Sequence, residues 1–209
     1  MRINICILLL LTPLLFVGCL SPAERLEPEV VRQVKEGLNR PEVEKIMGKP
    51  GSVVTGSGDH SVAHYGYIRR IESAEFALIG NLAKNPGDIL LRHLSVLYNG
   101  KNTVEKVLFH QSLTPFKTGF GKASAGQVVA AESVREIKKG TSTADDLVKL
   151  FGEPHQKVLD VNGDLVMQWY YAKSQMGWVR NQNEGQTLSV TFDQAGVVKE
   201  HTLSGNVQP

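Results

Sequence analysis

The sequence predicts an α+β protein of two tandem helix–helix–antiparallel β-meander units, with the helices packed on one face of the sheet. One short pattern occurs twice, at residues 37–50 and 140–154: a glycine, a polar cap, an amphipathic helix and a Gly-x-Pro stop. Each copy is followed by segments with strand-like alternation, separated by turns such as Asn99-Gly100 and Asn162-Gly163. A pattern of this kind indicates one supersecondary unit used twice.

Composition supports a folded protein and narrows the choice of function. The chain has 209 residues, of which 42% are hydrophobic and 21% charged, as in ordinary globular proteins. Its net charge is +2, and a charge so close to zero gives no reason to expect that the protein binds nucleic acid. Both cysteines lie within the first 19 residues, and the body must therefore be held by packing alone.

The first 18 residues have the layout of a secretory signal peptide. Arg2 precedes the apolar run Ile5–Val17, and Gly18-Cys19 follows. This end resembles a bacterial lipobox, which implies that Cys19 becomes the lipidated first residue of the mature chain. The resemblance implies that Cys19 carries a diacylglyceryl group and a third acyl chain, such as palmitate, on its amino group, and two or more acyl chains anchor a protein stably. The alternative is an ordinary signal peptide or membrane anchor with a chance cysteine. Leu20, in place of Asp, favours the outer membrane, with the chain facing the periplasm.

The first repeat is expected at residues 29–112, after a short tether at 19–28. A helix at Glu29–Glu36 is predicted to end at Gly37, and Asn39 is predicted to cap a second helix. The inward stripe of that second helix is Val43, Ile46 and Met47. Strands are expected at 52–55, 61–67, 90–98 and 104–110.

The second repeat is expected at residues 127–209, after a Gly- and Ser-rich linker at 113–126. A helix at Gln127–Lys139 is predicted to end at Gly140, with Val128, Ala131, Val134 and Ile137 aligned. Ser142 or Thr143 is expected to cap the next helix, with Leu147, Leu150 and Phe151 facing inward. Strands are expected at 156–159, 165–171, 187–192 and 197–203.

The two repeats align by simple offsets. At an offset of 104 residues, Gly48, Pro50, Val54, Tyr65 and Tyr67 meet Gly152, Pro154, Val158, Trp169 and Tyr171. At an offset of 94, Leu94, Val96 and Tyr98 meet Leu188, Val190 and Phe192. The difference is extra length in the first copy, between its second and third strands.

This pattern resembles the SmpA/OmlA family of bacterial lipoproteins, which includes a small lipoprotein of the outer-membrane β-barrel assembly machinery. The tandem arrangement is also similar to the β-lactamase inhibitor protein fold. The residues that carry the resemblance are Gly37, Asn39, Val43, Ile46, Met47, Gly48 and Pro50, and then Gly140, Ser142, Leu147, Leu150, Phe151, Gly152 and Pro154. The motif terminates and packs a helix and specifies no reaction. The resemblance implies a protein-binding role in the bacterial envelope.

No catalytic, cofactor or metal site is predicted. His60 and His64 are four residues apart, but on a strand that spacing does not bring them together. Asp145 and Asp146 are explained by the positive end of a helix and need no acid–base role. The expected partners are the membrane, through Cys19, and an unidentified envelope protein.

The best candidates for partner contact lie in long excursions at equivalent places in the two units. They carry large apolar side chains: Phe76, Leu78, Ile79 and Leu82 in the first, and Met176, Trp178 and Val179 in the second. The excursions either bind a partner or lipid, or fold back as a cap on the sheet. As an alternative function, Tyr65, Tyr67, Trp169 and Tyr171 could stack a sugar or peptide in a hydrolase or binding protein. That alternative requires the four rings to be exposed in one pocket.

Overall fold

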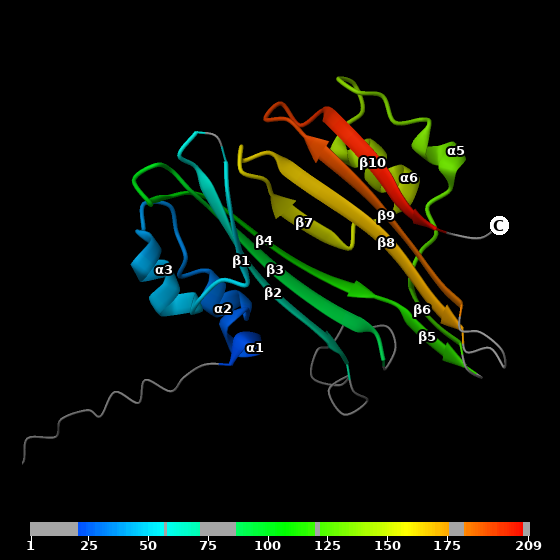
Figure 1. Ribbon diagram of the computed structural model, residues 1–209, viewed down its shortest axis with the longest axis horizontal. Helices are drawn as coiled ribbons and strands as arrows, with labels where there is room; N and C mark the ends of the chain where they lie inside the picture. The colour runs from blue at the N-terminus through cyan, green and yellow to red at the C-terminus, as the bar shows by residue number, and fades with distance from the viewer. Residues whose placement is uncertain (1–20, 57, 72–86, 120–121, 176–181, 207–209) are drawn as a thin grey trace, which may run out of the picture.

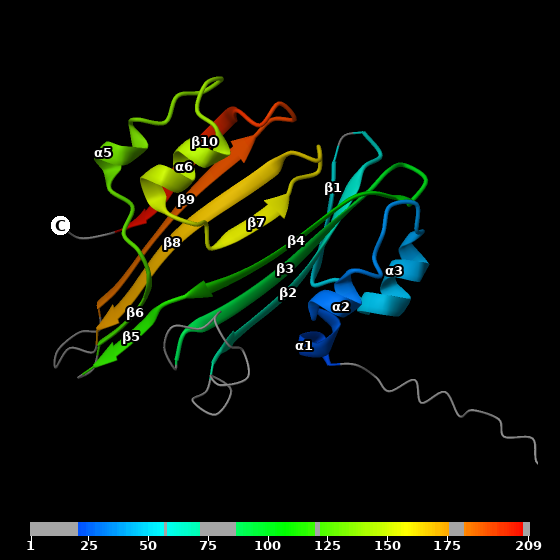
Figure 2. The same ribbon diagram turned by 180° about the vertical axis from the view of Figure 1, so that it is seen from behind.

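The computed structural model describes residues 21–56, 58–71, 87–119, 122–175 and 182–206. It shows an α+β protein in which strands predominate, as the sequence predicts for the class (Figure 1). The described strands form two antiparallel sheets, and short helices cover one face of each (Figures 1 and 2). We refer to them as the first sheet, of order β1-β2-β3-β4, and the second sheet, of order β10-β9-β8-β6-β5 with β7 paired to β8.

The segment expected to be a tether folds onto the first sheet. Residues Pro22–Arg25 form helix α1, with Ser21 as its N-cap, and Leu26 is buried in the core. Pro22 does not oppose this helix, because it occupies the first turn, where its missing N–H is not needed. The next helix, α2, covers only Pro28–Val31, not Glu29–Glu36 as expected. The chain continues through tight i→i+3 turns, with Val34 N bonded to Val31 O, so the valine side chains still reach the core.

The two helices that precede the Gly-x-Pro stops form as predicted. Helix α3 (Arg40–Met47) is capped by Asn39, and α6 (Ala144–Phe151) by Thr143, each within a capping box. Gly48 and Gly152 terminate them with φ of +75°, a conformation that L residues with a side chain rarely adopt. Leu150 differs from the prediction, because it lies on the exposed side of α6.

The first sheet extends the predicted strands by a few residues. Its strands are β1 (Ser52–Thr55), β2 (Ser61–Arg70), β3 (Ile89–Tyr98) and β4 (Val104–Thr114). In the β2–β3 ladder Ser61 pairs with Tyr98 and Arg70 with Ile89. One face of this sheet packs against the helices, and together they form a single core. Its buried residues are Leu26, Val31, Val34, Val43 and Met47 from the helical segments and Ala63, Tyr65, Leu94, Val96, Tyr98 and Val104 from the strands.

The second sheet contains two strands that the sequence did not suggest. Where a flexible loop was expected, Phe116–Gly119 forms β5 and Lys122–Gly126 forms β6, which pairs with β8. The other strands match the predicted positions: β7 (Gln156–Leu159), β8 (Leu165–Gln175), β9 (Gln182–Phe192) and β10 (Val198–Asn206). Only Pro115 lies between β4 and β5, so one nearly continuous strand runs from the first sheet into the second.

The second core has a thinner helical cover than expected. Helix α5 spans only Ala131–Val134, not Gln127–Lys139. Val128 is exposed and its neighbour Val129 is buried instead, because Gln186 on β9 bonds both the N–H and the carbonyl of Val129. The buried residues of this core are Val129, Ile137, Leu147, Phe151, Met167, Trp169, Leu188, Val190, Phe192 and Val198.

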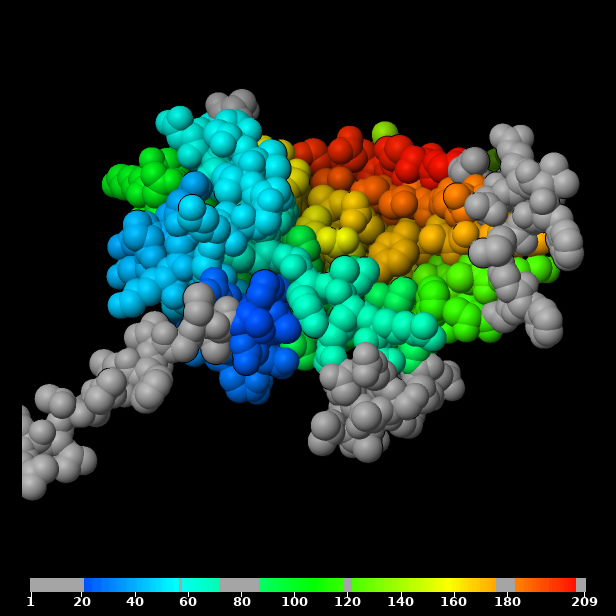
Figure 3. All heavy atoms as spheres, turned by 60° about the horizontal axis from the view of Figure 1, so that its bottom comes forward, coloured from blue at the N-terminus to red at the C-terminus, as the bar shows by residue number. Residues whose placement is uncertain are grey.

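Figure 3 looks onto the face of the second sheet that α5 and α6 leave open, with β8, β9 and β10 in yellow to red. Strand β2 of the first sheet, in cyan and teal, lies to one side of this face. Among the residues that the structure describes, no helix is both long and apolar enough to span a membrane.

Candidate functional site

The residues predicted to contact lipid or partners lie outside the described parts of the chain. This holds for Cys19, for the first excursion with Phe76, Leu78, Ile79 and Leu82, and for the second with Met176, Trp178 and Val179. Their roles stay predictions. The described residues offer two other places of interest, a pocket beside α1 and the seam between the two sheets.

The four aromatic residues considered for ligand stacking do not form one site. Tyr65 and Trp169 are buried, with 5% and 1% of their surface exposed, and they belong to different cores. Trp169 packs at 5.7 Å from Phe151, and its Nε1 donates to the carbonyl of Gly152 at 2.8 Å. The requirement that all four rings share one exposed pocket is not met, so the sugar- or peptide-stacking reading is wrong for this arrangement.

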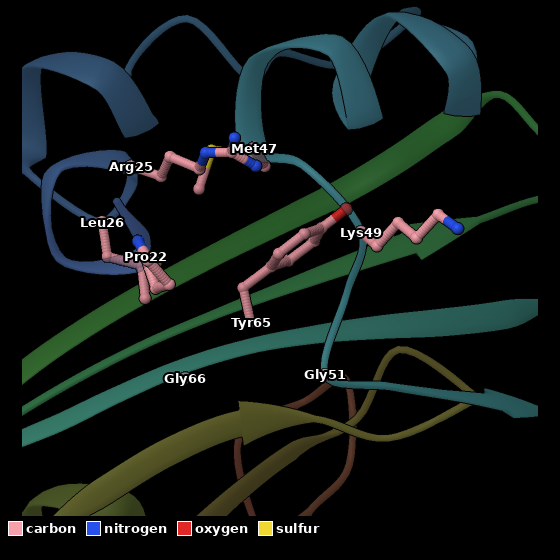
Figure 4. A pocket seen from close by; sticks show the side chains of 8 residues that line it. All are labelled: Pro22, Arg25, Leu26, Met47, Lys49, Gly51, Tyr65 and Gly66. Carbon is pink, nitrogen blue, oxygen red and sulfur yellow. The ribbon is translucent and has the colours of Figure 1, made fainter. Parts of the chain in front are cut away.

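The pocket lies where α1 meets the start of β1 and the middle of β2 (Figure 4). It has a volume of about 250 Å³, and its wall includes Pro22, Arg25, Leu26, Met47, Lys49 and Tyr65. Figure 4 shows the Tyr65 ring between the α1 residues on one side and Lys49 on the other. Leu26 and Met47 make the wall apolar, while Lys49 is exposed. The volume is below the roughly 300 Å³ at which pockets for drug-sized ligands begin, and so suits one inserted side chain.

The Tyr65 hydroxyl adds a polar feature to this wall. Among the described residues it is a buried group with no hydrogen-bond partner, as is the hydroxyl of Tyr98. Burial raises the pKa of the Tyr65 hydroxyl far above its ordinary value, and that of Tyr98 to about 12. Both rings therefore stay neutral, and the two hydroxyls interact with each other without forming a well-aligned hydrogen bond.

The seam is the contact between β7 of the second sheet and strands β3 and β4 of the first. Its apolar part is a small cluster in which Leu159 packs on Val62 and Leu97. Polar contacts surround the cluster. The N–H of Leu159 donates to Ser95 Oγ at 3.2 Å, and Lys106 Nζ donates to the carbonyl of Gly163 at 2.7 Å.

Four histidines line the seam. His64, His93 and His110 project from β2, β3 and β4, and His155 immediately precedes β7. The His64 and His93 rings are 5.3 Å apart, and Gln156 Nε2 crosses the seam to His93 Nδ1 at 3.0 Å. The carbonyl of His155 accepts from Ser112 Oγ at 2.6 Å.

Burial lowers the pKa of each of these histidines. The pKa of His93 and that of His155 fall to about 4, and those of His64 and His110 fall below their ordinary value. A nearby basic side chain adds to the effect of burial at three of them: Lys157 lowers the pKa of His110, and neighbouring histidines disfavour a further proton on His93 and His155. The seam is therefore built from neutral imidazoles.

His60 and His64 are separated, as the strand spacing predicts. His60 pairs with Glu105 at 3.1 Å, whereas His64 contacts His93 and Ser95. Within the described ranges, no group of His, Cys, Asp or Glu has an arrangement that could hold a metal ion. Asp146 is accounted for by the helix cap, since it accepts from Thr143 N and Oγ1 at 3.0 and 2.8 Å.

Sequence reasoning did not find the seam. His93, His110 and His155 stand in three separate segments with no shared motif, and only the packing of β7 on β3 and β4 brings His155 to the other two. A weak signal was available, because His93 and His110 occupy strands predicted to pair across the Asn99-Gly100 turn, and they do pair directly.

Comparison with known proteins gives one match. Residues 126–202 match the family described as outer membrane protein assembly factor BamE domain. No curated protein and no solved structure matches the chain. The matched residues run from the end of β6 to β10 and include α5, α6 and the second Gly-x-Pro stop. The C-terminal part of the chain, over residues 126–202, is thus similar to the SmpA/OmlA-type BamE domain.

Proposed function

We propose that this chain is a lipid-anchored, non-enzymatic protein of the bacterial cell envelope that binds another protein during outer-membrane protein assembly. The observation that carries the proposal is the BamE domain match at residues 126–202, since its description names an assembly factor. The proposed location is the periplasmic side of the outer membrane, with lipidated Cys19 as the anchor. The first described residues, next to this position, fold directly onto the first sheet, which would hold the first unit close to the membrane.

We further propose that the chain is a tandem repeat of one unit, with repeats at 29–112 and 127–209. Both halves have a capping box, a helix stop at a glycine with φ of +75°, and a four-strand meander. In both, an isolated bridge joins the capping segment to the last hairpin, Asn39 to Thr103 and Thr143 to Val197. These parallels support a duplicated unit, although only the second copy matches the family.

Two surfaces are proposed for the partner. The first is the pair of apolar excursions, around Leu78 and Trp178. The second is the pocket beside α1, whose apolar wall and single-side-chain volume suit an anchoring residue of a protein partner. An exposed lysine at its rim, Lys49, favours an acidic flank beside that anchor.

Site-specific crosslinking in living bacteria tests the proposal. A photo-reactive amino acid is placed at Leu78, Trp178 or Lys49, and at Lys101 as a control on the exposed β3–β4 turn. We expect a discrete adduct with an envelope protein from at least one of the first three positions and none from Lys101. Depletion of the chain should lower the amount of β-barrel protein in the outer membrane. Absence of position-specific adducts together with an unchanged outer membrane would refute the function.

The anchor is tested separately. Cys19→Ser should move the protein from the membrane fraction to the soluble periplasmic fraction or leave it unprocessed. If the variant remains membrane-bound and processed like the wild type, lipidation at Cys19 is wrong while the partner proposal stands.

A further inference from the structure

The seam joins the two units through far fewer contacts than hold each unit together. The apolar part is limited to Val62, Leu97 and Leu159, with Leu108 and Val161 packed against them. Each unit also has its own helix-covered core on the other face of its sheet. Loss of the seam contacts would therefore leave two folded units joined through β4 and β5.

One assignment of hydrogens satisfies every polar contact along the seam's central chain. Gln156 Nε2 donates to His93 Nδ1 at 3.0 Å, and His93 Nε2 donates to His64 Nδ1 at 3.2 Å. Ser95 Oγ lies 3.2 Å from the same His64 nitrogen, and it accepts from the N–H of Leu159 at 3.2 Å. In this assignment His93 Nδ1 and His64 Nδ1 each accept, so both imidazoles are neutral, and the single lone pair of His64 Nδ1 is shared between His93 Nε2–H and the Ser95 hydroxyl.

His155 is also held as an acceptor. Its Nδ1 accepts from the backbone N–H of Tyr170 at 3.1 Å, and its ring lies 4.3 Å from the Tyr170 ring. A proton on Nδ1 would place two donors against each other and move the ring from the position that sets the start of β7. The carbonyl of the same residue is the acceptor for Ser112 across the seam.

The surrounding charges give a proton little compensation. His93 is faced by His64 and His110, and His155 by His110, all of them basic. His110 is faced by Lys157 and by Glu153, whereas burial alone lowers the pKa of His64. Glu153 is largely exposed and pairs with Lys157 at 3.9 Å. The backbone of Pro154 and His155 and the Glu153 carboxylate favour a proton on His110 and offset part of the effect of burial there, whereas no such group among the described residues acts on His93 or His155.

We propose that the seam is a proton-operated hinge. At mildly acidic pH, protonation of His93 and His155 breaks the contacts of β7 with β3 and β4. The second unit then moves relative to the first about the β4–β5 connection, while both cores stay folded.

The expected pH range follows from the difference between the pKa of His93 and His155 in the closed seam and in water. An opened seam returns each imidazole to water, with an ordinary pKa of 6.5, whereas the closed seam holds the pKa of each near 4. The closed state is therefore fully favoured above pH 6.5 and loses its advantage as the pH falls from 6.5 towards 4. At pH 5 the ratio of open to closed molecules rises at most about 30-fold per histidine relative to pH 8.

Distance measurement between spin labels tests the hinge on the full-length chain in detergent. The labels are placed at Lys45→Cys on α3 and Glu136→Cys after α5, both exposed, in a background of Cys6→Ser and Cys19→Ser. We expect one narrow distance distribution at pH 7.5 and a second, longer and reversible population at pH 5. Circular dichroism should show the same sheet content at both pH values.

Two variants decide whether the histidines are responsible. His93→Gln with His155→Gln removes the two most strongly shifted histidines and should greatly reduce the response, the remainder coming from His64 and His110, whereas His60→Gln, at an exposed pair with Glu105, should leave it unchanged. If the double variant does not fold, His93→Gln alone must show a response shallower by one proton. The hinge is overturned by identical distance distributions at both pH values, by an undiminished response in the histidine variants, or by loss of the circular dichroism signal together with the distance change.

Discussion

Tyr65 and Trp169, which align in sequence at an offset of 104 residues, should respond in opposite ways to replacement by phenylalanine. Trp169→Phe removes a hydrogen bond of 2.8 Å to the carbonyl of Gly152, at the helix stop, and leaves space in a core where the indole is 1% exposed. The lost hydrogen bond costs about 1 kcal/mol and the missing ring atoms about 1–2 kcal/mol. We expect the free energy of unfolding to fall by about 2–3 kcal/mol.

Tyr65→Phe is the matched control. It removes a buried hydroxyl that has no hydrogen-bond partner among the described residues, while the ring and its packing remain. Since the hydroxyl loses its water on folding and gains no bond, its removal should be neutral or stabilise the protein by up to about 1 kcal/mol.

Urea unfolding followed by circular dichroism measures both changes without relying on tryptophan fluorescence. The corresponding shift in Tm for Trp169→Phe is about 4–12 °C downward for a chain of this size. Two results would contradict this reasoning: Tyr65→Phe destabilising the protein as much as Trp169→Phe does, or Trp169→Phe costing less than about 0.5 kcal/mol. Either would show that the hydrogen bond assigned to Trp169, and the lack of one at Tyr65, do not determine stability.

Three further predictions concern the two helix caps, a glycine at the end of β6 and a tyrosine. Asn39→Ala and Thr143→Ala should each lower the free energy of unfolding by about 1 kcal/mol in urea titrations, because each removes the cap of its helix, and a loss in only one of them would contradict the equivalence of the two helices. Gly126→Ala should cost at least about 2 kcal/mol in the same assay, since φ is +78° and the new Cβ would lie 1.9 Å from the carbonyl oxygen of Tyr170; wild-type stability would refute the described close approach of β6 to β8. Burial raises the pKa of the Tyr98 hydroxyl from 10.0 to about 12, so its neutral form is fully stabilised below pH 10 and stability is lost as the pH rises from 10 to 12. Tyr98→Phe should flatten that part of a stability–pH curve, and an unchanged slope would contradict the burial of the hydroxyl.

The elements that the sequence predicts well are those specified by local chemistry. Helix α6 is marked by a capping residue at Thr143, acidic residues in the first turn and a glycine stop, and all of these act within a few residues. The β-meanders are likewise marked by alternation and by turns such as Asn162-Gly163, and their strands appear within a few residues of the expected ends.

The elements that the sequence misses depend on distant partners. Strand β6 (Lys122–Gly126) has the composition of a loop and becomes a strand because β8 supplies its hydrogen bonds. The helix expected at Gln127–Lys139 shrinks to α5 because Gln186 on β9 fixes Val129 in an extended segment ahead of it. The seam could not be predicted from the sequence for the same reason, because its histidines lie on or next to strands that meet only in the folded protein.

The short passage from β4 to β5, through Pro115 alone, changes where the C-terminal part of the chain can be cut out as an independent fragment. The family match begins at residue 126, but β5 and β6 form the edge of the second sheet from Phe116 onward, where β5 pairs with β6 and β6 pairs with β8 as far as Gln175. A fragment that starts at residue 127 would leave this half of β8 as a bare edge, open to pairing with other chains. Expression of residues 116–209 should give a monodisperse protein, whereas residues 127–209 should aggregate.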